Sequence, residues 1–350
     1  MKRRSLFTLA GLGMLGTAGL AACSQQSNSG TPNSEQPSGS PSKLETLRVH
    51  VPTTLAFMAP MASFGTLGKL DGLVGKTDVQ NWADVEIMKS LIVNGETDLV
   101  ATPSYAAANL FNKGLPVKLV AITVWGMLYV LGPEGSAAQG VEGLKGKEVA
   151  VPMPNNMPDL VFRYLMTQSG ISLDGGAEGI KVTKYEQASE IIQPLLSGQI
   201  EYAVLPEHVA TVVQGKAKEA GKTLDRTLNL QELWGKVTGG QARFPMAGVV
   251  MPSKLVDANP ALVGGVLNEL EAAVTQVNSL DEKTLATITE KTKVQEPAVK
   301  SVIPRLQLEV VPAQKAKSEL EDFYTRLTTL SPDIVGGKMP ADDFYLADPR

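Results

Sequence analysis

The sequence predicts an α/β protein of two lobes joined by a two-crossing hinge. Short β-branched and aliphatic runs alternate with amphipathic stretches at helical spacing, a pattern typical of sheets covered by helices on both faces. The 350 residues allow two compact lobes, and 43% apolar content excludes a mainly disordered chain. Glycines gather at 132–143, and a strand-like run returns near Pro245. We therefore predict lobe one over 44–131 plus 247–350 and lobe two over 132–246, with a cleft that closes about the hinge.

Each predicted element rests on a local pattern. The predicted strands are β-branched or aliphatic runs at 47–51, 98–101, 117–131 (as two short strands or one bent strand), 148–151, 180–185, 201–205 and 245–251. The predicted helices cover 84–93, 104–111, 158–166, 188–197, a segment after 206, 259–277, 285–292, 298–305 and 316–330, most of them marked by apolar residues at three- and four-residue spacing. The apolar stretch 55–70, which Pro60 and glycines interrupt, is predicted as a helix with an irregular entry. Strands and helices thus alternate through most of the chain.

Charge excludes some partners. The formal net charge is −4, and it becomes −7 without the first 22 residues, which hold three basic residues and no acidic ones. A protein that binds nucleic acid or anionic lipid through electrostatics needs an excess of lysine and arginine. We therefore expect no nucleic-acid partner.

The N-terminus has the features of an export signal. Three basic residues precede an apolar run over 6–22, which is too short to span a membrane comfortably and ends in small residues. Cys23, the one cysteine of the chain, follows at once, and the LAAC stretch at 20–23 resembles a lipobox. That resemblance implies a lipoprotein signal peptide over 1–22 and lipidation of Cys23; the alternative is a free thiol after an ordinary signal peptide. The basic residues also resemble a twin-arginine signal, so the export route stays open.

Residues 23–43 are predicted to form a flexible tether. Between 24 and 42 the chain has no large apolar residue and cannot offset the entropy of ordering. A lipid on Cys23 would then hold the folded part outside the cytoplasm, on the periplasmic or cell-surface side of a bacterial membrane, through the lipid anchor alone.

Several motifs occur in a fixed order along the chain. They are the lipobox, DLVATPS at 98–104, GKEVAVP at 146–152, ASEIIQPLLSGQIEYAVLPEHV at 188–209, and LWGKVTGG followed by FPMAGVV within 230–250. With them the chain resembles a solute-binding lipoprotein of an ABC importer, of the nitrate/sulfonate/taurine (NitT/TauT)-like family. The resemblance covers the whole mature domain and implies a type II periplasmic-binding-protein fold. It also implies a monomer that holds a small-molecule ligand between its lobes and delivers it to ABC permease and ATPase subunits.

Four turns that follow strands should converge on the cleft, at 52–54, 102–104, 154–157 and 206–208. Ligands bind at the carboxyl ends of strands in open α/β sheets, and three of these turns lead into helix N-termini with free backbone N–H groups. The candidate ligand-binding residues in or near these turns are Thr53, Thr54, Phe57, Thr102, Ser104, Trp125, Asn155, Asn156, Met157, Glu207 and His208. Other roles stay open: capping for the hydroxyls, a turn pair for the asparagines, buried packing for Trp125, and a match to its helix dipole for Glu207.

The same turns indicate the charge of the ligand. They contain no arginine, whereas Asp159 and Glu207 place carboxylates near helix starts, which argues against a multiply charged anion such as sulfate or phosphate. We expect a neutral, zwitterionic or cationic ligand with a flat apolar part against Trp125, Phe57 and Met157, and weaker binding in Glu207→Gln. The family often carries Glu-Pro where this chain has Glu207-His208, so no substrate carries over from the resemblance.

No cofactor, metal site or catalytic residue is predicted. His50 and His208 are too few for a transition-metal site on their own, and methionines are more often gap fillers than ligands. Those near the loops are Met58, Met61, Met153 and Met157. Cys23 is the only thiol, no Gly-x-Ser-x-Gly elbow occurs, and Glu207 and His208 would lie about 100° apart on a helix, a poor acid–base pair. The alternatives are an enzyme on the same fold acting on a small aromatic or heterocyclic substrate, and a ligand-sensing lipoprotein.

Overall fold

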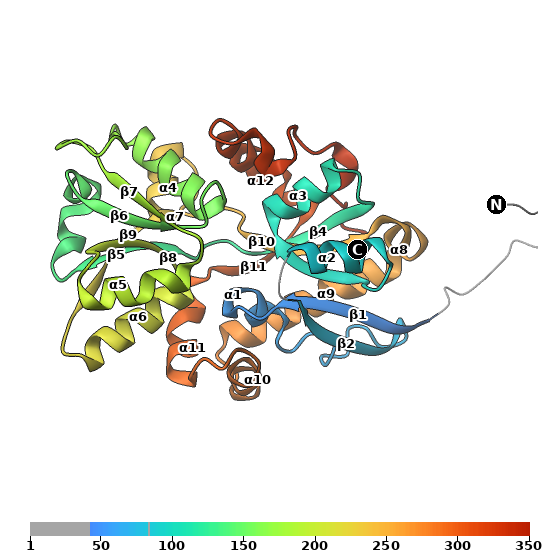
Figure 1. The fold of residues 1–350 in the computed structure, drawn as a ribbon. Helices are drawn as coiled ribbons and strands as arrows, with labels where there is room; N and C mark the ends of the chain where they lie inside the picture. The colour runs from blue at the N-terminus through green and yellow to red at the C-terminus, as the bar shows by residue number, and fades with distance from the viewer. Residues whose placement is uncertain (1–42, 83–84) are drawn as a thin grey trace, which may run out of the picture. The chain divides into compact units, whose positions relative to one another are not determined.

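The structure is a computed structural model that describes residues 43–82 and 85–350. The predicted signal peptide, Cys23 and the tether up to residue 42 lie outside the described residues. Within those ranges helices surround two separate β-sheets (Figure 1). None of the described helices combines the length and apolar content that crossing a bilayer requires.

The six-stranded sheet has the order β11-β4-β10-β3-β1-β2. Its strands are β1 (Leu44–Pro52), β2 (Val74–Trp82), β3 (Leu99–Pro103), β4 (Val117–Val124), β10 (Ala247–Pro252) and β11 (Leu308–Pro312). β1 runs parallel to β2 and β3, whereas β10 runs antiparallel between β3 and β4. The sequence pattern does not predict β2, because it is a polar edge strand whose middle residues are exposed or half-buried.

The five-stranded sheet has the order β7-β6-β8-β5-β9. Its strands are β5 (Leu128–Pro133), β6 (Glu148–Pro152), β7 (Lys181–Tyr185), β8 (Tyr202–Pro206) and β9 (Leu224–Asn229). The apolar run over 117–131 therefore forms two strands in two different sheets. Residues 128–131, which the sequence assigns to lobe one, lie in the five-stranded sheet. The chain passes between the sheets at 125–127 and returns at 239–246.

Helices cover both faces of each sheet. The α-helices are α1 (Leu55–Met58), α2 (Val85–Val93), α3 (Ser104–Asn112), α4 (Met157–Gln168), α5 (Ile192–Ser197), α6 (Glu207–Glu219), α7 (Leu230–Thr238), α8 (Ser253–Ala258), α9 (Pro260–Asn278), α10 (Glu282–Thr292), α11 (Glu296–Val302) and α12 (Ala313–Thr328). The 3₁₀ helices are η1 (Ala59–Met61), η2 (Ser136–Leu144), η3 (Ala188–Ile191), η4 (Ile303–Arg305), η5 (Pro332–Val335) and η6 (Asp342–Phe344). In β6, Val149 and Val151 pack in the core cluster that contains α4, while Ala150 packs in the cluster of α5 and α6 on the other face.

The predicted helix over 55–70 is wrong beyond Met61. Pro60 lies in the 3₁₀ helix η1, and Gly65 and Gly68 adopt positive φ values of 85° and 76°, which end helical structure. The turns that follow are held from another element: both carboxylate oxygens of Glu269, buried in α9, accept hydrogen bonds of 2.8 Å from the backbone N–H groups of residues 65, 67 and 69.

Gly248 sits at the most crowded point of the six-stranded sheet, in β10 between β3 and β4. A Cβ at this position would lie 2.1 Å from the carbonyl oxygen of Ala121, so β4 would have to move away. We expect Gly248→Ala to lower the free energy of unfolding by about 2–4 kcal/mol in urea denaturation. The control is Gly215→Ala in α6, where an added Cβ meets nothing within 4 Å and should be neutral or slightly stabilising. Equal stability of the two variants would contradict this packing.

Candidate functional site

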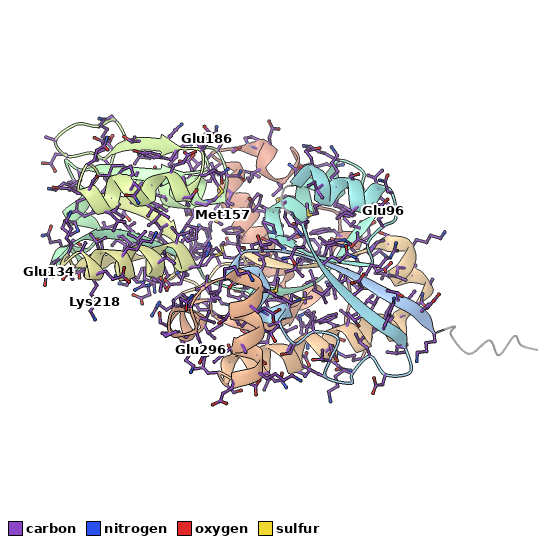
Figure 2. The ribbon with its side chains drawn as sticks, turned by 60° about the horizontal axis from the view of Figure 1, so that its bottom comes forward. Glu96, Glu134, Met157, Glu186, Lys218 and Glu296 are labelled. Carbon is purple, nitrogen blue, oxygen red and sulfur yellow. The ribbon has the colours of Figure 1, made fainter. Side chains whose placement is uncertain are left out.

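A cavity of about 380 Å³ lies between the two sheets. We call it the inter-sheet cavity. Six segments form its wall. They are the turn after β1 with α1 (Thr54, Phe57), the end of β3 with the start of α3 (Pro103, Tyr105), the two crossings with the start of β5 (Met127, Leu128, Met246), the turn after β6 with the start of α4 (Met153, Met157, Pro158), the start of η3 (Gln187, Ala188, Ser189), and the end of β8 with the start of α6 (Pro206, His208, Val209). Met157, labelled in Figure 2, lies on the side of the five-stranded sheet that faces the six-stranded sheet. Turns from both sheets therefore share one hollow, as the sequence predicts for this class of fold.

The turn after β6 has a strained backbone. Met153 and Asn155 adopt positive φ values of 55° and 59°, which side chains other than glycine rarely accept. The Asn155 N–H donates a 2.8 Å hydrogen bond to the carboxylate of Asp159 in the first turn of α4, and Asp159 is fully buried. Strain of this kind is concentrated at sites that hold ligands, because the surrounding structure must enforce it.

Four of the predicted site residues line the inter-sheet cavity: Thr54, Phe57, Met157 and His208. The sequence did not single out Tyr105, one residue beyond a predicted turn, or the residues of the crossings and of η3. Tyr105 had a usable signal, since it lies in the first turn of a helix that directly follows a strand. The crossing residues had none, because nothing local shows that residues 127 and 246 meet.

His208 is the most informative polar group in this wall. Its Nδ1 atom is buried and has no hydrogen-bond partner among the described residues. Burial lowers the pKa of His208 to about 4, and none of the described residues that line the cavity is charged and opposes this shift. The imidazole is therefore neutral at pH 7, with hydrogen-bonding capacity left over.

The pH dependence of stability tests the neutral state of His208. Its pKa is near 6.5 in an unfolded chain and about 4 in the folded one, so the unfolded state binds more protons between these values. The stabilising contribution is complete above pH 6.5 and is lost as the pH falls towards 4. We expect the wild type to lose about 2 kcal/mol more than His208→Asn over this range in urea denaturation. His50, whose pKa burial also lowers, contributes equally to both proteins. Parallel pH profiles of the two proteins would contradict the burial of His208.

Three of the candidate ligand-binding residues that carry a hydroxyl group do not line the inter-sheet cavity. Ser104 is fully buried, and its Oγ donates a 2.5 Å hydrogen bond to the Pro245 carbonyl, which ties α3 to the return crossing. Thr102 is fully buried in β3, its hydroxyl has no partner within the described part of the chain, and it does not line the cavity. Thr53 is exposed between β1 and α1 and does not line it either.

Asn155, Asn156 and Trp125 line two other hollows. The asparagines face Tyr105 and Asn109 across a hollow of about 520 Å³, which shares Tyr105 with the inter-sheet cavity. Trp125 lines a hollow of about 480 Å³ beside Arg243, whose guanidinium carbon lies 4.0 Å from a Trp125 ring centroid. The Nε1 atom of Trp125 donates a 3.0 Å hydrogen bond to the Glu309 carbonyl. The structure therefore stacks Trp125 on an arginine and does not bring it to the inter-sheet cavity.

Glu207 is fully buried at the start of α6 and is held by two arginines. Arg226 in β9 donates to it at 2.7 Å and 3.1 Å, and Arg305 in η4 donates at 2.6 Å. Thr211, one turn along α6, donates a further 2.8 Å hydrogen bond. Glu207 does not line the inter-sheet cavity, and its carboxylate is already satisfied by these partners. Its position thus differs from the direct ligand contact that the sequence predicts.

Solved structures with this fold are similar to the chain in three-dimensional structure, whereas its sequence matches none of the known families. The chain matches no protein family and no curated protein. It is similar to a solved ABC transporter structure from Parabacteroides distasonis, with 22% identity and a TM-score of 0.70 over 87% of this chain and 99% of the other. The periplasmic aliphatic sulphonate binding protein SsuA from Escherichia coli is similar at 17% identity and a TM-score of 0.63, over 85% and 93% of the two chains. The periplasmic nitrate-binding protein NrtA from Synechocystis PCC 6803 follows at 14% identity and a TM-score of 0.57, over 83% and 84%. These similarities confirm the predicted α/β periplasmic-binding-protein fold.

Proposed function

We propose, on the premise of this shared fold, that the chain is an extracytoplasmic solute-binding protein of an ABC importer. It captures a small organic molecule in the inter-sheet cavity and delivers it to a membrane permease that an ATPase subunit drives. The observation that carries the proposal is the cavity wall: Thr54 and Tyr105 follow strands of the six-stranded sheet, whereas Met157 and His208 follow strands of the five-stranded sheet. A ligand there contacts both halves of the molecule at once.

This arrangement supports binding by lobe closure. The two sheets are joined through 125–127 and 239–246, so a rotation about these crossings changes the distance between the cavity walls. A solute that touches both walls gains more contacts when the walls approach, and this difference in affinity drives closure. The cavity volume of about 380 Å³ lies within the usual range for small-molecule sites.

Retained solute provides the test. Native mass spectrometry of the freshly purified protein should show a bound small molecule that is absent after unfolding, and the stripped, refolded protein should rebind it in titration calorimetry. The solute should be recovered chemically unchanged after prolonged incubation, because a transport protein performs no reaction. Recovery of a converted product would favour the enzyme alternative and overturn the proposal, and so would an absence of binding to every fraction of a cell extract.

The proposed anchor is a lipid on Cys23. We expect Cys23→Ser to move the protein from the membrane fraction to the soluble fraction of cells, since Cys23 is the one cysteine in the sequence. Partitioning into Triton X-114 measures this change. A variant that stays with the membrane would contradict the anchor and leave the binding function untouched.

A further inference from the structure

The described residues that line the inter-sheet cavity carry no formal charge. None of them is a lysine, arginine, aspartate or glutamate. Four carboxylates are adjacent in sequence to lining residues. Glu186 and Glu190 are exposed. Asp159 and Glu207 lie in the first turns of α4 and α6, are fully buried, and are engaged by Arg163 at 3.6 Å and by Arg305 at 2.6 Å. They also occupy the positive ends of both helix dipoles, which would otherwise attract an anion. A charged solute would therefore lose its water without gaining an opposite charge.

The apolar part of the wall is rich in sulfur. Four methionines, Met127, Met153, Met157 and Met246, face the cavity together with Phe57. Thioether groups are polarizable and adapt to the faces and edges of flat rings. This composition favours a planar, unsaturated solute over a compact polar one.

A few neutral polar groups in the wall are left without protein partners. Besides His208 Nδ1, the Tyr105 hydroxyl has no partner among the described residues, and Thr54 makes no capping hydrogen bond with its side chain. Burial raises the pKa of Tyr105 to about 12 and lowers that of His208 to about 4, so both are uncharged at neutral pH. Of these three groups only His208 Nδ1 is buried, so leaving it unsatisfied is costly unless a ligand pairs with it; Tyr105 is half-buried and Thr54 is exposed.

We propose that this cavity takes an uncharged, flat and mainly apolar molecule that hydrogen-bonds to His208 and Tyr105. The inference rests on the proposed solute-binding function and narrows its ligand class. Two of the structural neighbours are named as sulphonate-binding and nitrate-binding proteins. Sulphonate and nitrate are anions, so an uncharged ligand would differ from both in charge.

Three probes with the same ring test the charge of the ligand: benzamide is neutral, benzenesulfonate is an anion and protonated benzamidine is a cation. Ligand-observed NMR with the full chain should show benzamide binding at least tenfold more tightly than either ion. Tighter binding of benzenesulfonate or benzamidine would overturn the uncharged class while leaving a binding protein, and equal binding of all three, or of none, would also overturn it. The solute retained by the purified protein gives a second readout: it should pass into ethyl acetate at both pH 2 and pH 12, whereas extraction at only one pH shows an ionised ligand.

Toluene separates the hydrogen bonds from the apolar fit. His208→Phe should weaken benzamide binding at least fivefold and leave toluene binding within twofold of wild type, because toluene has no hydrogen-bonding group. Tyr105→Phe should give a smaller effect of the same kind. Equal losses for benzamide and toluene would show damage to the cavity and overturn the assigned hydrogen bonds. Failure of the native mass spectrometry test would instead remove the solute-binding function itself.

Discussion

Glu207→Gln is expected to lower the free energy of unfolding by about 3 kcal/mol, although the change removes only a charge. The Glu207 side chain is fully buried, while those of Arg226 and Arg305 are only 22% and 32% exposed. Removing one partner from a buried ion pair leaves the other charges uncompensated, and this typically costs 3–5 kcal/mol. Partial exposure lets water solvate the two arginines, which places the expected loss at the lower end of that range. Urea denaturation measures it.

The matched control is Glu309→Gln. Glu309 also accepts a hydrogen bond from an arginine, Arg243 at 2.6 Å, but its side chain is 59% exposed. Exposed ion pairs contribute between zero and about 1 kcal/mol, so this variant should be nearly as stable as the wild type. Similar losses of unfolding free energy in the two variants would contradict the stabilising role assigned to the buried Glu207 carboxylate.

The Glu207 cluster also joins distant parts of the chain. Arg305 is 98 residues away in sequence, in the segment that leads from α11 to β11 of the six-stranded sheet. Any loss of ligand affinity in Glu207→Gln should therefore accompany the loss of stability. Arg305→Met should reproduce part of this loss of stability. Weaker binding in a variant of unchanged stability would show that Glu207 contacts the solute directly, as the sequence pattern predicts.

Ala188→Trp is expected to weaken binding of the retained solute at least 100-fold, a loss of about 2.7 kcal/mol or more in titration calorimetry. Ala188 begins η3 and lines the inter-sheet cavity, so an indole at this position takes much of the 380 Å³ that a ligand would use. The side chain is half-buried, which lets the larger group enter the hollow without displacing the core. Stability should change little.

Ala138→Trp provides the control for Ala188→Trp. Ala138 is exposed on η2, away from the residues that line the cavity, so its replacement adds the same side chain to the surface. Binding should stay within twofold of wild type. If Ala188→Trp binds as well as Ala138→Trp, the solute occupies another hollow, such as the one beside Trp125 or the one beside Asn155.

Local patterns predicted the fold where strands are buried on both sides. β3, β6 and β8 are short apolar runs between turns, and their alternation with helices is visible in the sequence. β2, β9 and β11 were missed, because all three are edge strands with many polar or half-exposed residues. Their pairing with β1, β5 and β4 is a tertiary property that no local window contains.

The candidate site was predicted only in part, because it too depends on contacts between residues that are far apart in the sequence. Turns after strands place Thr54, Phe57, Met157 and His208 at the cavity, since strand ends in this fold converge. Glu207 and His208 are neighbours, yet a helix turns adjacent side chains about 100° apart, so one meets two arginines and the other meets the cavity. Trp125 is covered by Arg243, a partner that lies far along the chain and leaves no local signal.

A crystal structure of the freshly purified protein with its retained solute should show whether one uncharged solute is held between the two sheets. We expect continuous density in the inter-sheet cavity, flat in shape, within hydrogen-bond distance of His208 and Tyr105 and in contact with Met157. Density for an anion, or a solute in the hollow beside Arg243 with the inter-sheet cavity empty, would disprove this mode of binding.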